Sequence, residues 1–473
     1  MRQNRVLLVM CCGMFLVLLD VTIVNVAVPA ITTGLRTSTA GVQWVVDGYT
    51  VAIASLLLAG GTLGDRLGHK ATVLGGLVLF GIASAGCALA TAVPELIAAR
   101  AAQGTGAALL LPGSLAAVAD VFPDRAQQAK ALGIWAAVSS LALPAGPVLG
   151  GFLVSSLGWR AVFWINPPVA MLCVVGVAAW VPRGRPKTAR LDWRGLALAT
   201  TALAAAVYAV IAAGEGAWAP VAVAALVSLA AGTALFVAER IVANPLLPPA
   251  VFRRPAFRVA NAAALIMNLT SNGLLFVVTR YLQTIQGHSA ATAGLMLLAM
   301  SVPVPVMAPL AGRATARRGP VPVLVAGAAI AGTGQLCLLL AGASSPYALL
   351  FPSLFGVGVG IGIFVSPVVA MSIRAVPPER SGLASGINNT ARQVGTALGV
   401  AVFGAAAGSP ALTSHFITAM HVLGAAAALA WLLVIALVTR SASRNSDLVG
   451  VPHRQNRRND RPTGQYSYKE ELE

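Results

Sequence analysis

Fourteen apolar runs follow one another along almost the whole chain. A helix needs about 20 residues, at about 1.5 Å per residue, to cross about 30 Å of hydrocarbon. Strands of an outer-membrane barrel instead alternate apolar and polar residues over about 10 positions. Because helices satisfy their own backbone groups in lipid, we predict an all-α membrane protein with spans at 6–32, 43–63, 72–92, 95–119, 129–155, 161–181, 195–214, 218–238, 257–282, 289–312, 321–341, 346–373, 382–407 and 417–439.

The composition excludes a soluble fold, because 57% of the residues are hydrophobic and only 10% are charged, whereas soluble domains carry about 25% charged residues. The five cysteines lie inside apolar runs without a C-x-x-C pair, and the five histidines are scattered, so we expect no disulfide and no metal site. The chain has no G-x-x-x-x-G-K-S/T nucleotide motif and no recognisable nucleophile–base spacing. We therefore predict that it is not an enzyme, needs no cofactor and draws its energy from an ion gradient.

The basic residues are distributed very unevenly between the two sides of the predicted spans. Of the 32 Lys and Arg residues, Arg36 and Arg160 fall in loops opposite the termini, and Arg100, Arg280 and Arg392 fall within spans. All the others lie in the termini or in loops on the same side as the termini. Cytoplasmic loops carry this excess of positive charge. The pattern predicts a multi-pass protein of the inner (cytoplasmic) membrane with both termini in the cytoplasm, and it explains the net charge of +17 without a nucleic-acid partner.

The spans are expected to form two halves. A basic segment rich in Pro and Gly, 182–187, follows the sixth span, and the ninth span starts near residue 257. Six spans, an inserted pair and six more spans are the pattern of a duplicated transporter. We therefore predict an N-terminal half at 1–181, a linker with two extra spans at 182–256, a C-terminal half at 257–439, and a basic cytoplasmic tail at 440–473 that is expected to be disordered.

The segment 61–70 reads G-T-L-G-D-R-L-G-H-K and resembles the G-x-L-x-D-R-x-G-R/K-R/K loop of the major facilitator superfamily, from which His69 departs. Glycines permit tight turning between two spans. Asp65 is expected to cap the next helix or to pair with a cytoplasmic arginine and so to gate the inward face. A plain basic turn is the alternative. The matching positions are Gly61, Gly64, Asp65, Arg66, Gly68 and Lys70.

The first span contains L-D-V-T-I-V-N-V-A-V-P at 19–29. It resembles the first-span signature of the fourteen-span drug/proton antiporters. The carboxylate of Asp20 can be neutral at one stage of a cycle and charged at another, as proton coupling requires. A structural polar contact between helices is the alternative. Thr22 belongs to the same signature, Asn25 is expected to hydrogen-bond across helices, and Pro29 is expected to bend the helix or mark its outer end.

Two further charged residues are candidates for proton coupling. Arg100 begins R-A-A-Q-G, which resembles the family's R-x-x-Q-G signature. An arginine inside a span is costly and therefore usually functional, so we expect a fixed positive charge beside Asp20, unless Arg100 snorkels to the outer interface. Asp47 is either a second acidic site on the outward path or a solvated residue near the start of its helix.

The fifth span carries a pattern that resembles the antiporter motif, G-x8-G-x3-G-P-x2-G-G, with Ala142 in place of its second glycine. Gly and Pro at this spacing would kink the helix and allow close packing. The resemblance implies export, whereas an ordinary kink carries no direction. The motif residues are Gly133, Gly146, Pro147, Gly150 and Gly151.

The thirteenth span begins with a stretch, 385–395, that resembles the S-G-x-x-N-x-x-R-Q-x-G signature of the fourteen-span group, with Asn389 and Arg392 at its polar positions. Arg392 is expected either to gate or position, or only to snorkel, and the sequence leaves both open. Arg280, at the end of the ninth span, is most simply an anchor at the outer interface.

Together these motifs resemble the fourteen-span drug/proton antiporter family over spans 1–14, and the stretch 43–68 resembles actinobacterial antibiotic-resistance exporters. The resemblance implies the major facilitator fold, with 14 transmembrane helices as two six-helix halves plus two inserted helices. It implies export of drugs or antibiotics by proton antiport and alternating access, conferring resistance. Small lipophilic or antibiotic-like substrates, protons and the lipid bilayer are the expected partners of a monomer. The alternatives are an exporter dedicated to an endogenous secondary metabolite and, from another class, a membrane sensor or channel.

Overall fold

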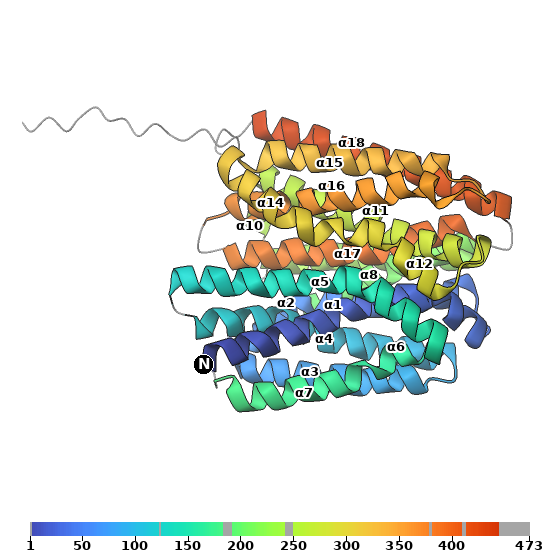
Figure 1. Cartoon of the computed structure of the whole chain (residues 1–473). Coiled ribbons are helices and arrows are strands. Elements are labelled where there is room, and N and C mark those ends of the chain that lie inside the picture. The colour runs from blue at the N-terminus through green and yellow to red at the C-terminus, as the bar shows by residue number, and fades with distance from the viewer. Residues whose placement is uncertain are drawn as a thin grey trace, which may run out of the picture.

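The structure, a computed structural model, describes residues 2–122, 124–182, 192–241, 249–377, 381–408 and 413–443. Within these ranges the chain is helical and contains no strand, and the long helices run along one common direction (Figure 1). Most of the predicted linker before the seventh span and nearly all of the predicted tail lie outside the described residues. The all-α prediction is therefore confirmed for the part of the chain that forms the bundle.

Seven helices build the first six spans. Ser38 caps the second of them, where its side chain accepts a hydrogen bond from the Gly41 amide, and Asp124 caps the fifth in the same way through Gln127. Gly68, at φ 86°, is the single residue between the second and third helices. The helices are α1 (Arg2–Gly34), α2 (Thr39–Leu67), α3 (His69–Leu89), α4 (Val93–Val121), α5 (Arg125–Leu157), and the pair α6 (Ala161–Trp164) and α7 (Asn166–Trp180).

The inserted pair and the second half follow the same plan, with more breaks. The pair is α8 (Trp193–Gly214) and α9 (Trp218–Ile241). The second half is α10 (Pro249–Phe252), α11 (Pro255–Arg280) continued by a π-helix (Tyr281–Ile285), α12 (Ala290–Met296), α13 (Leu298–Ser301), α14 (Pro303–Arg318), α15 (Pro320–Cys337) continued by a 3₁₀ turn (Leu338–Leu340), α16 (Tyr347–Arg374), α17 (Ser381–Ala407) and α18 (Thr413–Ser443).

The predicted number of spans is confirmed. Thirteen spans within the described residues are long and apolar enough to cross a membrane by length and composition. The fourteenth is α17, which is 27 residues long and occupies the predicted thirteenth span. Its first half carries Asn388, Asn389, Arg392 and Gln393, which lower its hydropathy. The chain is thus an all-α membrane protein with 14 transmembrane helices.

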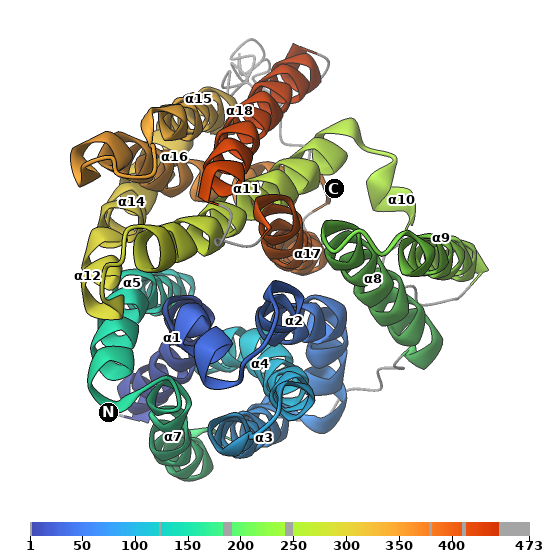
Figure 2. The same cartoon turned by 90° about the vertical axis from the view of Figure 1, so that its right-hand side faces the viewer.

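The two halves lie side by side, with the inserted pair at one edge. Figure 2 shows α1–α7 as one group, α11–α18 as the other, and α8 and α9 beside them. Helix α8 packs against both α2 and α17, one from each half, while α9 packs mainly against α8. Only 11% of the apolar window of α9 is buried, so this helix presents most of its surface outward, where lipid would lie.

Both ends of the described chain lie at the same end of the bundle. Helix α1 begins at Arg2 and α18 ends at Ser443, and both ends are at the left of Figure 1. We call this end the terminal face. We call the opposite end, where α1 ends at Gly34, the far face.

Candidate functional site

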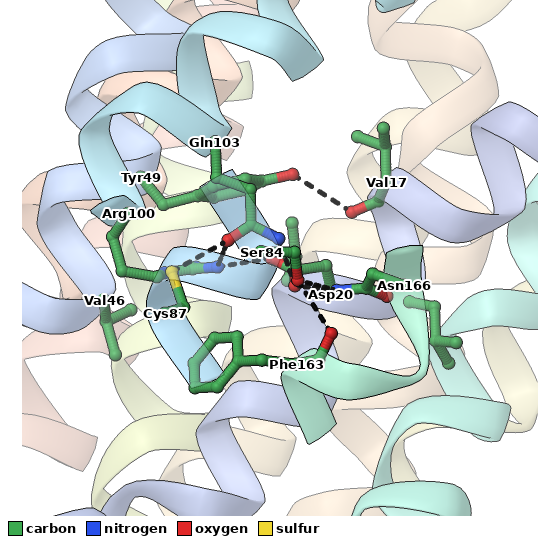
Figure 3. Close-up of polar contacts among 12 residues, drawn as sticks. Val17, Asp20, Val46, Tyr49, Ser84, Cys87, Arg100, Gln103, Phe163 and Asn166 are labelled. Carbon is green, nitrogen blue, oxygen red and sulfur yellow. Dashed lines mark hydrogen bonds and ion pairs between the residues drawn. The ribbon is translucent and has the colours of Figure 1, made fainter. Parts of the chain in front are cut away.

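A buried ion pair lies in the middle of the first half. Asp20 of α1 is 0% exposed and Arg100 of α4 is 1% exposed. The Nη1 atom of Arg100 donates to Oδ2 of Asp20 at 2.5 Å (Figure 3). Arg100 therefore lies inside the helix group, and the alternative that it snorkels to the interface is wrong.

Two amides complete the shell around the Asp20 carboxylate. Gln103 Nε2 and Asn166 Nδ2 each donate to Oδ1 of Asp20 at 2.9 Å. Gln103 also accepts a hydrogen bond of 2.8 Å from Arg100 Nη1, and Asn166 is tied to Ser84 of α3 at 3.0 Å. Three donors from α4 and α7 thus converge on one carboxylate of α1, as the close-up in Figure 3 shows.

Arg100 is also held from its other side. Its Nε donates to the Val45 carbonyl of α2 at 3.1 Å, and its guanidinium carbon lies 4.1 Å from the centre of the Tyr49 ring. The Tyr49 hydroxyl in turn donates to the Val17 carbonyl of α1 at 3.2 Å. Burial of an ion pair is costly unless its remaining polar atoms are hydrogen-bonded, and here α1, α2, α4 and α7 supply those partners.

Gln103 and Asn166 were not predicted to belong to this site. Gln103 lies within the quoted R-x-x-Q-G signature, and its spacing of three residues from Arg100 places both on one helix face. That spacing could have revealed it. Asn166 starts α7 and lies 146 residues from Asp20 in the sequence, so no local spacing links them.

Asp47 is a second buried carboxylate. It is 0% exposed, and neither of its carboxylate oxygens has a hydrogen-bond partner among the described residues. Helix α2 begins at Thr39, so Asp47 stands more than two turns inside it. The alternative of a solvated residue at a helix start is therefore wrong.

Asp47 lies on the side of α2 that faces the second half. Gln43, one turn earlier on the same face, donates through Nε2 to the carbonyls of Val400 and Ala401 of α17 at 3.3 and 3.1 Å. The two candidate carboxylates therefore differ in setting. Asp20 is paired within one half, whereas Asp47 lies next to the other half and its carboxylate oxygens accept no hydrogen bond from a described residue.

A cavity of about 160 Å³ lies between the two halves. Helices α1, α5, α11, α13, α14, α16 and α17 contribute its walls. Most of the described lining side chains are apolar or neutral polar, and Arg392 is the one ionisable residue among them. Leu18, Val21 and Thr22 line the cavity from α1. Asp20 points about 200° away from Leu18 around the helix, because an α-helix turns about 100° per residue.

The predicted gating loop is mostly helix. Helix α2 continues through Leu67, so Gly61, Gly64 and Arg66 belong to it, and the expected loop of about eight residues is reduced to Gly68. The reason is that the polar end of a transmembrane helix extends beyond the apolar core. Lys70 donates to the Ala178 carbonyl of α7 at 2.6 Å. The side chain of Asp65 lies outside the described part of the chain, so the expected latch stays a prediction.

The antiporter motif brings α5 close to both halves. A Cβ added at Gly146 would collide with Thr22 of α1, and one added at Gly151 would lie 2.6 Å from the Ala290 carbonyl of α12. The Pro147 carbonyl lies against Gly294 of α12, where it leaves no room for a Cβ. Gly150 packs on α1, and Gly133 lies in α5 nearer the terminal face.

The remaining motif residues of α1 act within the first half. Thr22 Oγ1 donates to the Ala142 carbonyl of α5 at 3.2 Å. Asn25 Nδ2 donates to the Val21 carbonyl of its own helix at 2.8 Å, so the expected bond across helices is not made by this donor. Pro29 lies inside α1, which continues to Gly34, and so does not mark the end of the helix.

Arg280 is not an anchor at the membrane interface. It is 6% exposed, its Nη2 donates to Thr39 Oγ1 of α2 at 3.1 Å, and its guanidinium lies over the rings of Phe276 and Phe416. The prediction of an interface anchor failed because a residue near the end of an apolar run can face either lipid or a neighbouring helix. The sequence of the run does not distinguish the two. Asn389 and Arg392 lie in α17, and Arg392 reaches the cavity.

Hydrogen bonds join the two halves near the far face. Besides those of Gln43 and Arg280, Gln283 Nε2 donates to the Val26 carbonyl at 3.0 Å, and the Ala291 amide donates to Ser155 Oγ at 3.2 Å. These bonds link α1, α2 and α5 to α12, α17 and α11 with its π-helical continuation at the far face.

Comparisons with known proteins agree with this architecture. A family model described as the Major Facilitator Superfamily matches residues 10–400 and 262–456. The chain is 35% identical over 396 residues to the Multidrug resistance protein Stp of Mycobacterium tuberculosis, which covers 83% of this chain and 73% of that protein. It is 34% identical to the Methylenomycin A resistance protein of Streptomyces coelicolor, with 83% of each chain covered.

Two further comparisons concern export and fold. The Tetracenomycin C resistance and export protein of Streptomyces glaucescens is 34% identical, over 84% of this chain and 74% of that protein. The structure of a D-xylose-proton symporter aligns with a TM-score of 0.66 at 16% identity, over 90% of this chain and 97% of that one. Their names describe resistance, export and symport, and this chain is a transporter and not an enzyme. The chain therefore belongs to the Major Facilitator Superfamily, in the drug-efflux family that these relatives represent.

Proposed function

We propose that this protein exports drugs or antibiotics across the cytoplasmic membrane in exchange for protons, by alternating access between its two halves. The names of the relatives, which describe multidrug resistance, antibiotic resistance and export, support the direction and the kind of cargo. The observation that supports the proton coupling is the buried ion pair between Asp20 and Arg100. Asp20 lies on α1, which also lines the central cavity.

Helix α1 connects the proton site to the substrate site. Asp20 faces α4 and α7, whereas Leu18 and Thr22 face the cavity on the other side of the same helix. A proton on Asp20 would remove the negative charge that holds α1 against Arg100. A small shift of α1 would then change the cavity wall, so that proton binding and substrate binding compete through one rigid element.

Several features of the cycle belong to the same proposal. The terminal face is cytoplasmic, as the basic loops suggest, and the far-face hydrogen bonds keep the outside closed in this conformation. Asp47 is a second proton site, which lies where the halves meet. Residues 1–181 and 257–439 move as the two halves, and 182–256 connects them. The proton gradient drives a monomer that works without a cofactor.

Proton-coupled efflux in everted membrane vesicles tests the proposal. Wild type, Asp20→Asn and the control Asp124→Asn would be compared on a panel of dyes and antibiotics, with an imposed pH gradient. Asp124 is a surface N-cap of α5, and Asn caps equally well, so this control changes a carboxylate without touching the network. We expect wild type and the control to export at least one compound and to release protons, and Asp20→Asn to do neither.

Two other outcomes would count against the proposal. Wild-type flux without any proton release would indicate a channel, and normal coupled transport by Asp20→Asn would remove Asp20 from the coupling and leave Asp47 as the next candidate.

A further inference from the structure

The central cavity carries a positive charge and no negative one. Arg392 of α17 is the one ionisable residue among its described lining residues, and no Asp or Glu is among them. The walls around it are mainly apolar and include Met267 and Met300, whose flexible side chains adapt to ligands of different shape. A cavity of this kind suits an apolar molecule with an acidic group better than a lipophilic cation.

The guanidinium of Arg392 has no ion-pair partner among the described residues. Its Nε is buried without a hydrogen-bond partner among them. The two other arginines within spans differ, because Arg100 is paired with Asp20 and Arg280 donates to Thr39. A buried charge without a partner is costly, and an anionic ligand in the cavity would supply the missing partner.

The two buried acids of the first half do not neutralise this charge. The Asp20 carboxylate faces α4 and α7, on the far side of α1 from the cavity, and receives three hydrogen bonds there. Asp47 lies on α2, a helix that contributes no described residue to the cavity wall. Within the described lining, the field in the cavity is therefore set by Arg392.

Neutral polar groups gather near the same end of the cavity. Asn268, Ser271 and Asn272 form one stripe of α11, at helical spacing, and all three line the cavity. Asn272 Nδ2 donates to Thr396 Oγ1 of α17 at 3.3 Å, which fixes α11 next to the turn that carries Arg392. These groups offer hydrogen bonds to additional polar atoms of a ligand.

We propose that the preferred substrates are amphiphilic monoanions, in which a carboxylate or a similar acidic group binds Arg392 and an apolar body of about the size of a benzene ring fills the cavity. The proposal rests on the export function proposed above and names its substrate class. The size follows from the cavity volume of about 160 Å³, because an apolar cavity of about 150 Å³ accommodates benzene.

The test is direct binding of three probes that share one body and differ in charge. Phenylacetate is an anion, phenylacetamide is neutral and phenethylamine is a cation. Their affinities would be measured by calorimetry on the purified full chain in lipid nanodiscs. We expect phenylacetate to bind at least about tenfold more tightly than phenylacetamide, because a charge-assisted hydrogen bond is about twice as strong as a neutral one, and phenethylamine to bind most weakly.

Variants separate the role of Arg392 from general effects on the fold. Arg392→Gln should lose the preference for phenylacetate but keep the affinity for phenylacetamide, and Arg392→Lys should retain part of the preference. Arg160→Gln is the matched control, because Arg160 lies at the far-face loop, where its Nη2 donates to the Ala90 carbonyl. This control should behave as wild type.

Three results would overturn the proposal. They are a preference of wild type for the amine or the amide, a preference for phenylacetate that survives Arg392→Gln, and no binding of any probe to wild type. None of them decides the export function, which the vesicle assay tests on other compounds. A wild type that exports cationic dyes with proton release, yet does not prefer phenylacetate, would leave export standing and remove the anion site. The order of the three wild-type affinities tests the proposal even if a variant fails to fold, because that measurement uses no variant.

Discussion

Asp20 and Arg100 lie 80 residues apart in the sequence and form an ion pair that is hidden from solvent within one half of the transporter. The pair connects α1, which lines the central cavity, to α4, which contributes no described residue to the cavity wall. The carboxylate also receives hydrogen bonds from Gln103 and Asn166. A change in its charge would therefore alter the contacts among α1, α4 and α7 together.

The energetic balance of this pair can be measured by paired substitutions. Arg100→Gln leaves the Asp20 carboxylate buried without its cation, and we expect a loss of about 3–5 kcal/mol, the usual cost of breaking a buried pair from one side. The double variant Asp20→Asn/Arg100→Gln removes both charges and should lose less. Thermal unfolding of the purified proteins in detergent would show this order. A double variant that is less stable than Arg100→Gln would contradict the view that the charges compensate each other.

The sequence predicted one part of this site better than another. The cost of a charge inside an apolar run singled out Asp20 and Arg100, and the resemblance joined them. Asn166 was missed because its partner is distant in the sequence and only the packing of α7 on α1 and α3 brings them together. Gln103 could have been predicted, since it follows Arg100 by three residues and so lies on the same helix face.

The fold was predictable because the bilayer fixes how long an apolar helix must be. The predicted spans agree with the helices to within a few residues at most of their ends. Where they differ, most helices are longer than the predicted span, as α2 is at both ends, from Thr39 to Leu67 rather than 43–63. That difference explains the wrong alternative for Asp47, which the shorter span placed near a helix start, and the wrong loop around Gly68.

A substitution at the second carboxylate separates coupling from stability. Asp47→Asn replaces a buried carboxylate whose oxygens have no hydrogen-bond partner among the described residues. The neutral amide is cheaper to bury than an ionised carboxylate, so we expect thermal stability that is equal to or higher than that of wild type. If Asp47 carries a proton during the cycle, the number of protons released per substrate should fall in the vesicle assay. Unchanged proton release would exclude Asp47 from the coupling.

The close approach of the halves at the far face requires a glycine at position 151. Gly151→Val would place a branched side chain where a Cβ already comes within 2.6 Å of the Ala290 carbonyl. We expect the far face not to close fully and efflux at equal expression to fall by about 5- to 150-fold, the range that corresponds to a steric cost of about 1–3 kcal/mol.

Gly232→Val is the matched control for this variant. Gly232 lies in α9, and a Cβ there would have no heavy atom within 4 Å. Its efflux should stay within about twofold of wild type, since valine is tolerated in an apolar helix that faces outward. Equal loss of efflux in Gly151→Val and Gly232→Val would show that the effect comes from helix propensity and not from contact between the halves.

Opening of the far face can be tested by locking it. The Ala291 amide lies 3.2 Å from Ser155 Oγ, so α5 and α12 approach closely enough for a disulfide between cysteines at these two positions. In Ser155→Cys/Ala291→Cys, we expect oxidation to abolish efflux and dithiothreitol to restore it. Alternating access requires this face to open once in each cycle, and a covalent bond between the halves prevents that. Mass spectrometry of the linked peptides would confirm the bond.

The single variant Ser155→Cys is the control for this experiment, because it contains the same five native cysteines as the double variant, including the half-buried Cys12 and Cys337. Oxidation should leave its efflux unchanged. An oxidised double variant that still transports at the wild-type rate would mean that substrate leaves without separation of α5 from α12. The halves would then have to part elsewhere, between α2 and α17, where Gln43 donates to Val400 and Ala401, and the same pair of experiments would move to those positions.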